Sequence, residues 1–522
     1  MMERIGALPG RQCAFLVTCA FLLIGIAVYG KSLGNGFVAF DDDTLVYGNP
    51  AVHELTSESI AWAFSHYDPE LYIPLTFLSY QIDDAIGGGS PFAFHLTNLL
   101  LHVLNALLVT WIVTLFIGGD RKCRLLSVCC GLLFLLHPLN TEAVSWISAR
   151  KDLLSSAFFF GALVAYLSYQ HRPVRRLLWL TALLFLLGLL SKVSVIILPF
   201  VLLVFDWREG RLSERKSWTE KIPLFALGVI FGVVAVTGKE SVLSDTHLLE
   251  AVLMAGKSTV FYLQKFLVPS DLSVIYPYTA AITLRSSDFF VPIVLLAVMG
   301  GVLIRSLHRT RDAVCAAMVF LLTLAPSFSN YAKAGDIYFA SDRYAYMPFL
   351  GFLIGSAALL AGISAWRRSV GIIVFVALVT CGVLAHRQSQ VWHDSFTLFS
   401  HTLNSYDDSH IAHNKVGAEL IDRKEFTEGV FHLRRSLEIR PTARALYNLG
   451  IAALLMGEKG EARMFNEQAI ALDPEYGPAY LNLSALLWED GERAGALRAA
   501  RKAVDLLPQD AEARRNLTLM EQ

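Results

Sequence analysis

Three consecutive carboxylates, Asp41, Asp42 and Asp43, directly follow the first long apolar segment of the chain. Adjacent Asp side chains repel one another, and the repulsion grows near low-dielectric lipid. We therefore expect at least one of them to have a raised pKa unless a cation or a substrate compensates. A carboxylate of this kind is suited to accept a proton. The alternative is a solvated turn or helix cap behind a membrane span, where Asp is common.

A second group of polar residues lies between two later apolar runs. His137 and Glu142 are followed by Arg150, Lys151 and Asp152. Polar groups at membrane depth are costly, so a His, a carboxylate and two adjacent cations at the mouth of a span indicate a function. The alternative is an ordinary turn in which Glu142 pairs with Arg150.

Two further cations stand alone among apolar residues. Lys192 lies between two short apolar runs, and Arg343, followed by Tyr344, precedes another. The planar fork of donors on an Arg side chain can hold a phosphate. The alternatives are that Lys192 snorkels to the membrane interface and that Arg343 pairs with Asp342.

Taken together, these residue types suit the transfer of a sugar from a lipid-linked phosphate. A carboxylate can deprotonate a hydroxyl nucleophile, while Lys and Arg stabilise a phosphate leaving group as charge develops on it. The sequence has no Gly-rich phosphate loop, paired-His metal motif or G-x-S-x-G elbow, which argues against a nucleotide-driven pump or a serine hydrolase. A transporter is expected to place its ionisable residues near the bilayer midplane instead.

The composition indicates a polytopic membrane protein that positions these residues. Of 522 residues, 54% are hydrophobic and 17% are charged, and the apolar residues form long runs. The run at 13–29 is expected to be an uncleaved first helix. Ten further candidate spans bring the total to about eleven, at 93–118, 125–137, 153–170, 177–190, 194–206, 222–238, 289–304, 313–329, 347–364 and 370–386. The stretch 248–269 is interpreted as an interfacial or re-entrant helix.

Basic residues give the expected orientation, because connections rich in Lys and Arg face the cytoplasm. They gather in alternate connections, at 121–124, 172–176, 208–216, 305–311 and 367–368. The side opposite the cytoplasm is then expected to hold the Asp triplet, the 138–152 loop, Lys192, the 330–346 loop and the chain after His386.

We expect an all-α protein of two domains: a transmembrane domain at 1–390 with a long outer loop at 31–92, and a soluble domain at 391–522. In the second domain, equivalent residues recur at intervals of 33 and 34: Gly417, Gly450 and Ser484, and Pro441, Pro474 and Pro508. This period is the signature of tetratricopeptide repeats, here about three. Such an α-solenoid can hold an extended protein segment in its groove; the alternative is a solenoid that only stabilises an oligomer.

An ordered set of motifs resembles a known family. The motifs are FVAFDDDTLVYGNPAV, YIPLTFLSYQID, FHLTNLLLHVLNALL, LHPLNTEAVSWISARKDLLS, SKVSVIILPFVLLVFDW, FLVPSDLSVIYPY, ASDRYAYMPFLGF and VWHDSFTLFSHTL. Followed by tetratricopeptide repeats, they resemble the bacterial multispanning tetratricopeptide proteins, relatives of the lumenal O-mannosyltransferases that act on cadherins. The resemblance covers nearly the whole chain.

The resemblance implies a glycosyltransferase of the GT-C type, which uses a polyprenyl- or dolichyl-phosphate sugar and carries its catalytic carboxylate in the first outer loop. The acidic pair of the family matches Asp41 and Asp42, with Asp43 as an additional candidate, and Asp42 is expected to act as the base or to orient the acceptor. The HP-containing loop matches 137–152, and the arginine-tyrosine motif matches Arg343 and Tyr344.

One position departs from the family. Where the relatives usually carry His or Arg before Pro-Leu-Thr, this chain has Ile73. If that position helps to bind the donor phosphate, then Arg150, Lys151, Lys192 or Arg343 must suffice here, or the activity differs.

The leading expectation is a bacterial inner-membrane enzyme, or an ER-membrane enzyme in a eukaryote, that transfers a sugar to a Ser or Thr hydroxyl of a protein. Mannose is the expected sugar, and the outward-facing repeats are expected to capture the acceptor. The alternatives are a non-catalytic membrane-anchored scaffold for an envelope complex and a transporter of lipid-linked sugars. Beyond the lipid-phosphate donor no cofactor is indicated, although a divalent cation could bridge phosphate and carboxylates. No metal-ligand spacing is present, and no nucleic acid partner is expected.

Overall fold

The structure, a computed structural model, describes residues 10–67, 71–238, 248–333, 336–362, 368–508 and 510–522. The chain forms two compact units, Met1–Asp394 and Ser395–Gln522. Both are built from helices, apart from one antiparallel pair of short strands in the first unit, β1 (Ala332–Lys333) and β2 (Asp336–Ile337).

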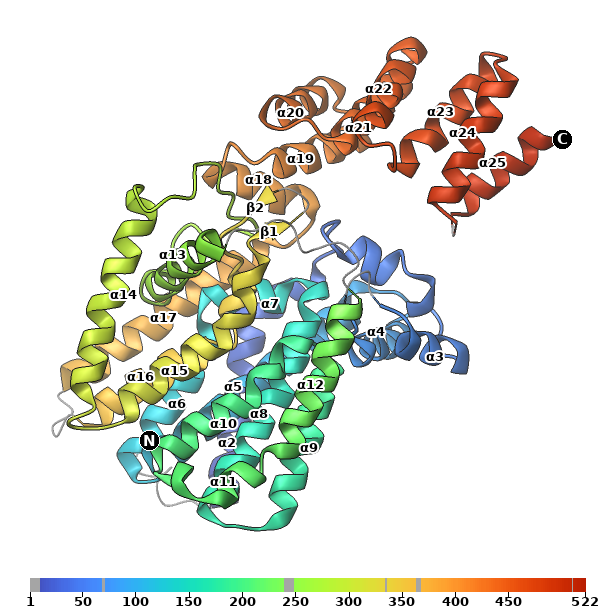
Figure 1. Cartoon of the computed structure of the whole chain (residues 1–522). Helices are drawn as coiled ribbons and strands as arrows, with labels where there is room; N and C mark the ends of the chain where they lie inside the picture. Colours follow the sequence, from blue (N-terminus) through green and yellow to red (C-terminus); the bar gives the residue numbers. More distant parts are fainter. Residues whose placement is uncertain (1–9, 68–70, 239–247, 334–335, 363–367, 509) are drawn as a thin grey trace. The chain divides into compact units, whose positions relative to one another are not determined.

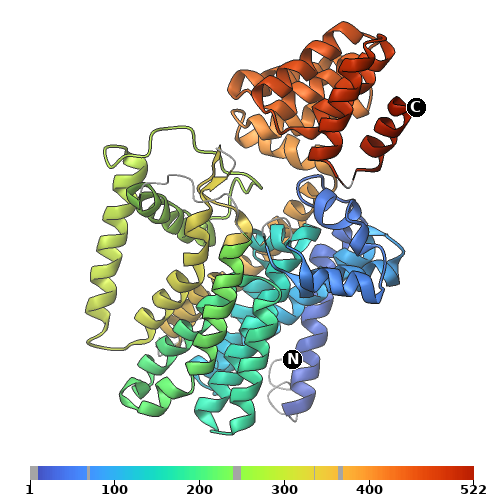
Figure 2. The ribbon, with the colours of Figure 1, turned by 45° about the vertical axis from the view of Figure 1, so that its right-hand side comes forward.

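Long helices dominate the first unit, because inside a bilayer an apolar segment can satisfy its backbone polar groups internally only as a helix or a closed barrel. Each of the eleven apolar segments expected to cross the membrane contains one helix (Figures 1 and 2): α2 (Gly10–Tyr29), α5 (Pro91–Ile117), α6 (Arg121–Leu136), α8 (Arg150–His171), α9 (Arg175–Leu189), α10 (Leu198–Arg208), α12 (Ile222–Thr237), α14 (Ser287–Ser306), α15 (Asp312–Leu324), α16 (Phe349–Ala361) and α17 (Arg368–Val391).

The expected number of about eleven spans is not confirmed. Seven helices in the described part of the chain are long and apolar enough to cross a membrane, or up to eight spans if α6 is joined to Pro138–Ser145, from which it is bent by 52°. Helices α9, α10 and α16 have only 15, 11 and 13 residues. At about 1.5 Å per residue they extend roughly 16–22 Å, well short of a hydrocarbon core of about 30 Å. The protein is multi-pass, with apolar helices of unequal length.

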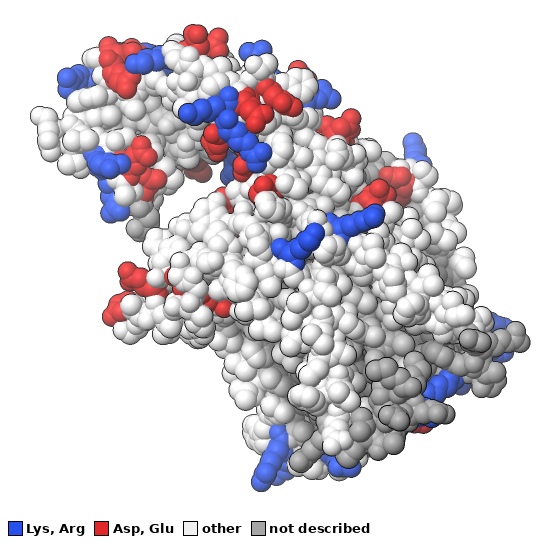
Figure 3. All heavy atoms as spheres, turned by 180° about the vertical axis from the view of Figure 1, so that it is seen from behind, with Lys and Arg blue, Asp and Glu red and all other residues white. Residues whose placement is uncertain are grey.

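The 248–269 stretch forms helix α13 (Leu248–Leu267), which packs against α14 and is not one of the seven. Of the basic residues that give the expected orientation, Arg367 lies outside the described residues. Figure 3 shows the reverse face of the first unit as a wide band without charged side chains, with Lys and Arg on either side of it.

Two sets of contacts mark the ends of the first unit. At one end, Arg208 donates to the carbonyl oxygen of Phe116 at 3.0 Å and pairs with Asp312 at 2.7 Å, which joins α5, α10 and α15 where the basic connections gather. At the other end, the backbone N–H of Gly36 donates to the carbonyl of His393 at 2.9 Å, which joins the segment after α2 to the end of α17. We refer to these as the basic end and the Asp42 end.

A buried carboxylate secures the basic end. Asp206, fully buried, accepts hydrogen bonds from Tyr166 at 2.8 Å, from Arg211 at 2.9 Å and from Lys221. Two cations and a hydroxyl surround one carboxylate, so its burial is compensated. The cluster ties α8 and α10 to the segment that precedes α12.

The expected outer loop at 31–92 is a set of short helices on an apolar core. Its elements are η1 (Gly30–Gly34), η2 (Asp43–Tyr47), η3 (Pro50–Val52), α3 (Ser57–Ser65) and α4 (Pro74–Gly87). Leu45, Val46, Phe77 and Tyr80 pack there with residues at the start of α5. Ile73, the position that departs from the family, is 1% exposed in the same core, so in this chain it packs rather than binds a ligand.

Short elements also lie within or beside the segments that carry the other candidate residues of the Asp42 end, while Arg150 and Lys151 begin α8. The short elements are η4 (Pro138–Asn140), α7 (Thr141–Ser145), η5 (Ile147–Ala149), η6 (Val193–Ile197), η8 (Ala325–Asn330) and η9 (Asp342–Ala345). Breaks of this kind place polar side chains where the long helices end, and they are tolerated because protein surrounds them.

The second unit consists of helix pairs with the expected 34-residue period. Its helices are α18 (Ser395–Ser405), α19 (His410–Asp422), α20 (Phe426–Ile439), α21 (Ala443–Leu455), α22 (Lys459–Leu472), α23 (Gly477–Glu489), α24 (Arg493–Leu506) and α25 (Ala511–Glu521). A Cβ atom on Gly417 would lie 2.8 Å from Leu433, which explains the small residue at the start of each repeat.

The turn between the two helices of each repeat requires a positive φ. Gly457 and Gly491 have φ angles of 85° and 81°, and Lys424 adopts 64° at the equivalent position of the first repeat. Glycine reaches this region without steric cost, whereas a lysine does not. The first repeat therefore lacks the turn glycine that the sequence shows in the other two.

Helices α15 and α16 approach closely, and this contact leads to a prediction. A Cβ on Gly351 would lie 2.5 Å from the Phe320 backbone nitrogen, and Gly355 follows four residues later. Such Gly-x-x-x-Gly spacing allows helix backbones to meet. We expect Gly351→Ala to lower the free energy of unfolding by about 1–3 kcal/mol through overpacking, measured by thermal unfolding in detergent.

Gly371→Ala is the matched control, because an added Cβ there has no heavy atom within 4 Å. It should leave the unfolding midpoint unchanged or slightly higher, since Ala favours a helix. Equal stability of the two variants would contradict the close approach.

Candidate functional site

The three consecutive carboxylates occupy three different environments. Asp42 is 1% exposed, whereas the Asp41 side chain is 40% exposed and Asp43 is partly exposed at the first position of η2. Asp43 accepts a hydrogen bond from the backbone N–H of Thr44 at 3.1 Å, a local contact at the start of that helix. The triplet therefore does not act as a single acidic cluster.

Asp42 anchors its loop to the segment before α8. One carboxylate oxygen accepts from the backbone N–H of Val38 at 2.9 Å, and the other accepts from the backbone N–H of Ser148 at 3.0 Å and from the Ser148 hydroxyl. Burial raises the pKa of Asp42 to about 6, while the hydrogen bonds from Ser148 and Val38 oppose part of that rise. Both oxygens are thus engaged in holding two loops together.

Asp41 faces the cations of the 137–152 segment. One of its oxygens lies 3.9 Å from Lys151 Nζ. The ammonium group of Lys151 lies 5.9 Å from the centre of the Trp146 ring, and the guanidinium of Arg343 lies 4.8 Å from the same centre. A single aromatic ring thus brings a partly exposed carboxylate and two cations into one neighbourhood.

His137 and Arg150 serve the fold instead. His137 is 1% exposed; its Nδ1 accepts from the backbone N–H of Leu139 at 3.3 Å and its Nε2 lies 3.3 Å from the Phe266 carbonyl oxygen. Arg150 is fully buried and pairs with Asp83 at 2.6 Å. The structure places neither of them with Arg343 and Lys192.

Arg343 pairs with Glu142. Its Nη1 donates to Glu142 Oε1 at 2.5 Å, and the Ser341 hydroxyl donates to the same oxygen at 2.8 Å. The two alternative pairings considered from the sequence, of Glu142 with Arg150 and of Arg343 with Asp342, are therefore wrong. Arg343 Nε is buried and has no hydrogen-bond partner among the described residues, so Glu142 satisfies only part of the guanidinium fork.

Asp342 lies behind this pair in an apolar setting. Its Oδ1 accepts a hydrogen bond from the Tyr276 hydroxyl at 2.6 Å. Burial, followed by the negative charge of Glu142, raises the pKa of Asp342 well above its usual range. Burial raises the pKa of Glu142 as well, and the adjacent guanidinium of Arg343 opposes that rise.

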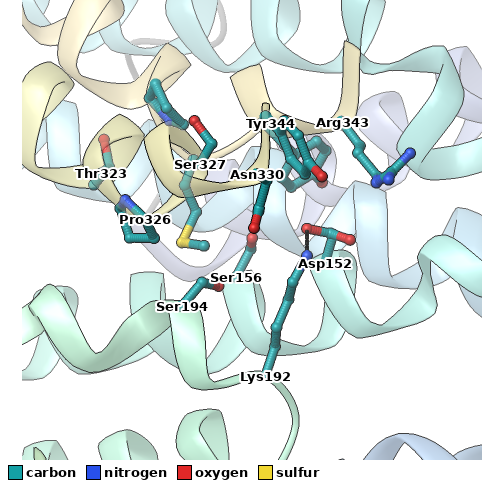
Figure 4. A pocket seen from close by; sticks show the side chains of 13 residues that line it. Asp152, Ser156, Lys192, Ser194, Thr323, Pro326, Ser327, Asn330, Arg343 and Tyr344 are labelled. Atoms are coloured by element: carbon teal, nitrogen blue, oxygen red, sulfur yellow. Dashed lines mark hydrogen bonds and ion pairs between the residues drawn. The ribbon is translucent and has the colours of Figure 1, made fainter. Parts of the chain in front are cut away.

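Lys192 and Arg343 line the same small cavity, of about 50 Å³, together with Asp152, Ser156, Asn330 and Tyr344. Lys192 Nζ lies 2.5 Å from Asp152 Oδ1. Figure 4 shows that Lys192, in the segment before η6, points toward Asp152. Arg343 and Tyr344, in the segment before α16, lie on the opposite side of the cavity. The Lys192 side chain is only 14% exposed and paired, so simple snorkelling to the interface does not describe it.

Of the residues singled out in the sequence, the structure thus gathers Asp41, Lys151 and Arg343 around Trp146, and Lys192, Arg343 and Tyr344 around the cavity. Sequence reasoning missed Ser148, Asp83 and Asn330. Their sequence contexts, QIDDA around Asp83 and SFSNY around Asn330, are polar, and nothing in the sequence marks Ser148, so only the fold reveals all three.

Comparisons with known proteins agree with the motifs. No protein-family model matches the chain. Protein O-mannosyl-transferase TMTC3 of Homo sapiens is 23% identical over 559 residues, which cover 93% of this chain and 60% of the relative. Protein O-mannosyl-transferase TMTC1 of Mus musculus is 32% identical over 179 residues, which cover 32% of this chain and 17% of the relative.

The chain is a relative of these protein O-mannosyl-transferases. The resemblance stated from the motifs is confirmed, although the chain spans only about 60% of the length of the first of these curated relatives. Among solved structures, ArnT from Cupriavidus metallidurans bound to undecaprenyl phosphate is 17% identical and covers 96% of this chain and 87% of its own, with a TM-score of 0.39. That score is too low to support an argument about a shared fold.

The raised pKa of Asp42 predicts how stability depends on pH. An Asp in the unfolded chain loses its proton near its usual pKa of about 4, whereas Asp42 in the folded chain retains it up to about pH 6. The unfolded state binds fewer protons in this window, so the free energy of unfolding falls as pH rises from about 4 to about 6 and then levels off.

The variant Asp42→Asn has no titratable group at this position, so comparison with it isolates the contribution of Asp42 to the pH dependence of stability. Relative to that variant, the wild type should lose about 3 kcal/mol of stability between about pH 4 and about pH 6, measured by thermal unfolding in detergent. A difference between the two proteins that does not change with pH would contradict the burial of an ionisable Asp42.

Proposed function

We propose that the protein is a membrane glycosyltransferase of the GT-C type that moves a sugar from a polyprenyl- or dolichyl-phosphate to a hydroxyl of a protein. The observation that carries the proposal is the gathering of Asp41, Lys151, Lys192 and Arg343 at one end of the membrane helices. The similarity to protein O-mannosyl-transferases supports it and makes mannose the first sugar to test.

Asp41 is the proposed base. Its side chain is 40% exposed, and its ion pair with Lys151 is long, at 3.9 Å. A Ser or Thr hydroxyl of the acceptor can reach this carboxylate from the solvent side, whereas both oxygens of Asp42 already accept hydrogen bonds from the protein. We therefore assign proton transfer to Asp41 and the positioning of its loop to Asp42, in place of the role expected for Asp42 from the sequence.

Lys192 and Arg343 are the proposed phosphate ligands. The acceptor oxygen attacks the anomeric carbon as its proton passes to Asp41, the bond from that carbon to the phosphate oxygen breaks, and the lipid phosphate leaves with the electron pair. The two cations stabilise the charge that develops on this oxygen. Asp152 and Glu142 hold them in place, and Glu142 takes only part of the Arg343 guanidinium fork.

A divalent cation that bridges phosphate and carboxylates is the cofactor still to be tested, and the chelator arm of the transfer assay tests it. Among the described residues, no group of three or more His, Cys, Asp or Glu side chains could hold a metal ion. The steps proposed here use the cations of the chain itself.

The repeats are proposed to present the acceptor on the same side of the membrane as the site. The chain leaves the first unit at the Asp42 end, where Gly36 contacts His393 immediately before the second unit begins. In the orientation expected from the basic connections, this contact supports a start of the repeats on the side opposite the cytoplasm, in a bacterial inner membrane or an ER membrane.

The first test is a transfer assay with purified protein, radiolabelled polyprenyl-phosphate mannose and a periplasmic extract, run with and without a chelator. Label should enter protein with the wild type. Asp41→Asn should lower the rate by about 10²–10⁴, the usual contribution of a general base. Glu54→Gln, an exposed acid of the same loop, is the control and should retain the wild-type rate.

If Asp42→Asn is as stable as the wild type but transfers no sugar, while Asp41→Asn remains active, then Asp42 is the base. Absence of transfer and of donor hydrolysis with every lipid-linked sugar would contradict the enzyme. It would favour the scaffold, or a transporter if lipid-linked sugar crosses the membrane without being transferred.

A second test addresses the phosphate ligands. Arg343→Lys keeps the charge but loses the planar fork, so donor binding and transfer should both fall by about 10–100-fold. Donor binding is measured directly by competition with unlabelled polyprenyl phosphate. The control is Arg305→Lys, at an exposed position near the end of α14, which should change neither quantity. Donor binding at the wild-type level in Arg343→Lys would rule out Arg343 as a phosphate ligand.

A further inference from the structure

A second cavity lies away from the candidate site, between α2, α6 and α17. It encloses about 540 Å³ and shares no lining residue with the cavity around Lys192 and Arg343. Its walls are aliphatic and aromatic along nearly their whole length, with Val28, Leu132, Leu136 and Val379 among them. Only His386 and Arg387, at one end, are polar.

The groove exists because α17 makes few contacts along its length. Only 6% of the most apolar window of this span is buried, against 78% for the span that contains α8. Gly382 faces α6 and α2 without a side chain, so that a Cβ there would lie 3.5 Å from Leu136 and 3.9 Å from Val28. His386 closes the end of the groove, where its Nδ1 lies 2.8 Å from the carbonyl oxygen of Val28.

The dimensions of the groove fit a lipid chain. Its lining on α17 extends from Phe375 to Arg387, roughly 18 Å of helix, which is slightly more than one leaflet of a hydrocarbon core of about 30 Å. An extended acyl chain can lie along a groove of this length.

The charges at the end of the groove fit the headgroup of such a lipid. Arg387 is exposed and lines the groove, and Lys31 is exposed three residues beyond Val28 on η1, which packs against α17. Both lie at the Asp42 end, and neither lines the cavity around Lys192 and Arg343. Cations at the level of the headgroups attract anionic lipids.

We infer that this groove binds an anionic phospholipid of the leaflet at the Asp42 end, with one acyl chain between α2, α6 and α17 and its phosphate at Arg387. The site is independent of the proposed transfer reaction, because the two cavities share no residue. It would fasten the loosely packed last span, and with it the chain that continues into the repeats.

The test measures lipid binding to the purified, delipidated full chain by native mass spectrometry. Phosphatidylglycerol should bind about fivefold or more tightly than phosphatidylcholine with the same acyl chains, as expected for one cation at the headgroup. Arg387→Ala should abolish that preference, whereas Arg305→Ala, an exposed cation near the end of α14, should retain it. Gly382→Leu, which fills the groove, should weaken the binding of both phospholipids.

Equal binding of the two phospholipids by the wild type, or an unchanged preference in Arg387→Ala, would overturn the inference. So would tighter binding of undecaprenyl phosphate than of phosphatidylglycerol in a manner that depends on Arg387, because the groove would then hold the polyprenyl lipid. The transfer assay with Asp41→Asn reports on the other site and stays interpretable in each case.

Discussion

The pairing of buried charge is the constraint on which the rest of this structure depends. Moving an ion out of water costs several kcal/mol, and the cost is recovered only through a well-placed partner. Arg150 therefore lies on Asp83, Arg343 on Glu142, and Lys192 on Asp152, at distances of 2.5–2.6 Å. Each pair joins segments far apart in sequence, so the short elements of the Asp42 end are located by these charges as much as by apolar packing.

The same constraint decides which charges are left for chemistry. A fully buried cation with all its donors engaged, such as Arg150, contributes to the fold alone. Arg343 differs, because Glu142 takes only part of its fork, and Asp41 differs from Asp42 because it remains partly exposed. A charged group that is positioned but incompletely satisfied can bind a phosphate or accept a proton without a large rearrangement, which is the condition for electrostatic preorganisation.

The sequence predicted the helical architecture, the repeat period and the set of polar segments, because those follow from apolar runs and regular spacing. It did not predict the partners. Glu142 and Arg343 are 201 residues apart, and Asp42 and Ser148 are 106 apart, so only the packing of the helices brings them together. The role expected for Asp42 came from the resemblance to the family, whereas in the structure Asp42 is buried against Ser148 and Asp41 remains partly exposed. The count of about eleven spans is not confirmed, because hydropathy registers an apolar run but not whether its helix is long enough to cross a bilayer.

The short helices explain why the site forms where it does. Helix α9 ends at Leu189, just before Lys192, and α16 begins at Phe349, just after Arg343. These helices extend only about 20 Å, less than a hydrocarbon core of about 30 Å. In the proposed function, cations at the ends of such short helices reach the phosphate of a lipid that remains in the bilayer. The polar breaks that make these segments poor spans are thus the feature that suits them to a membrane-embedded substrate.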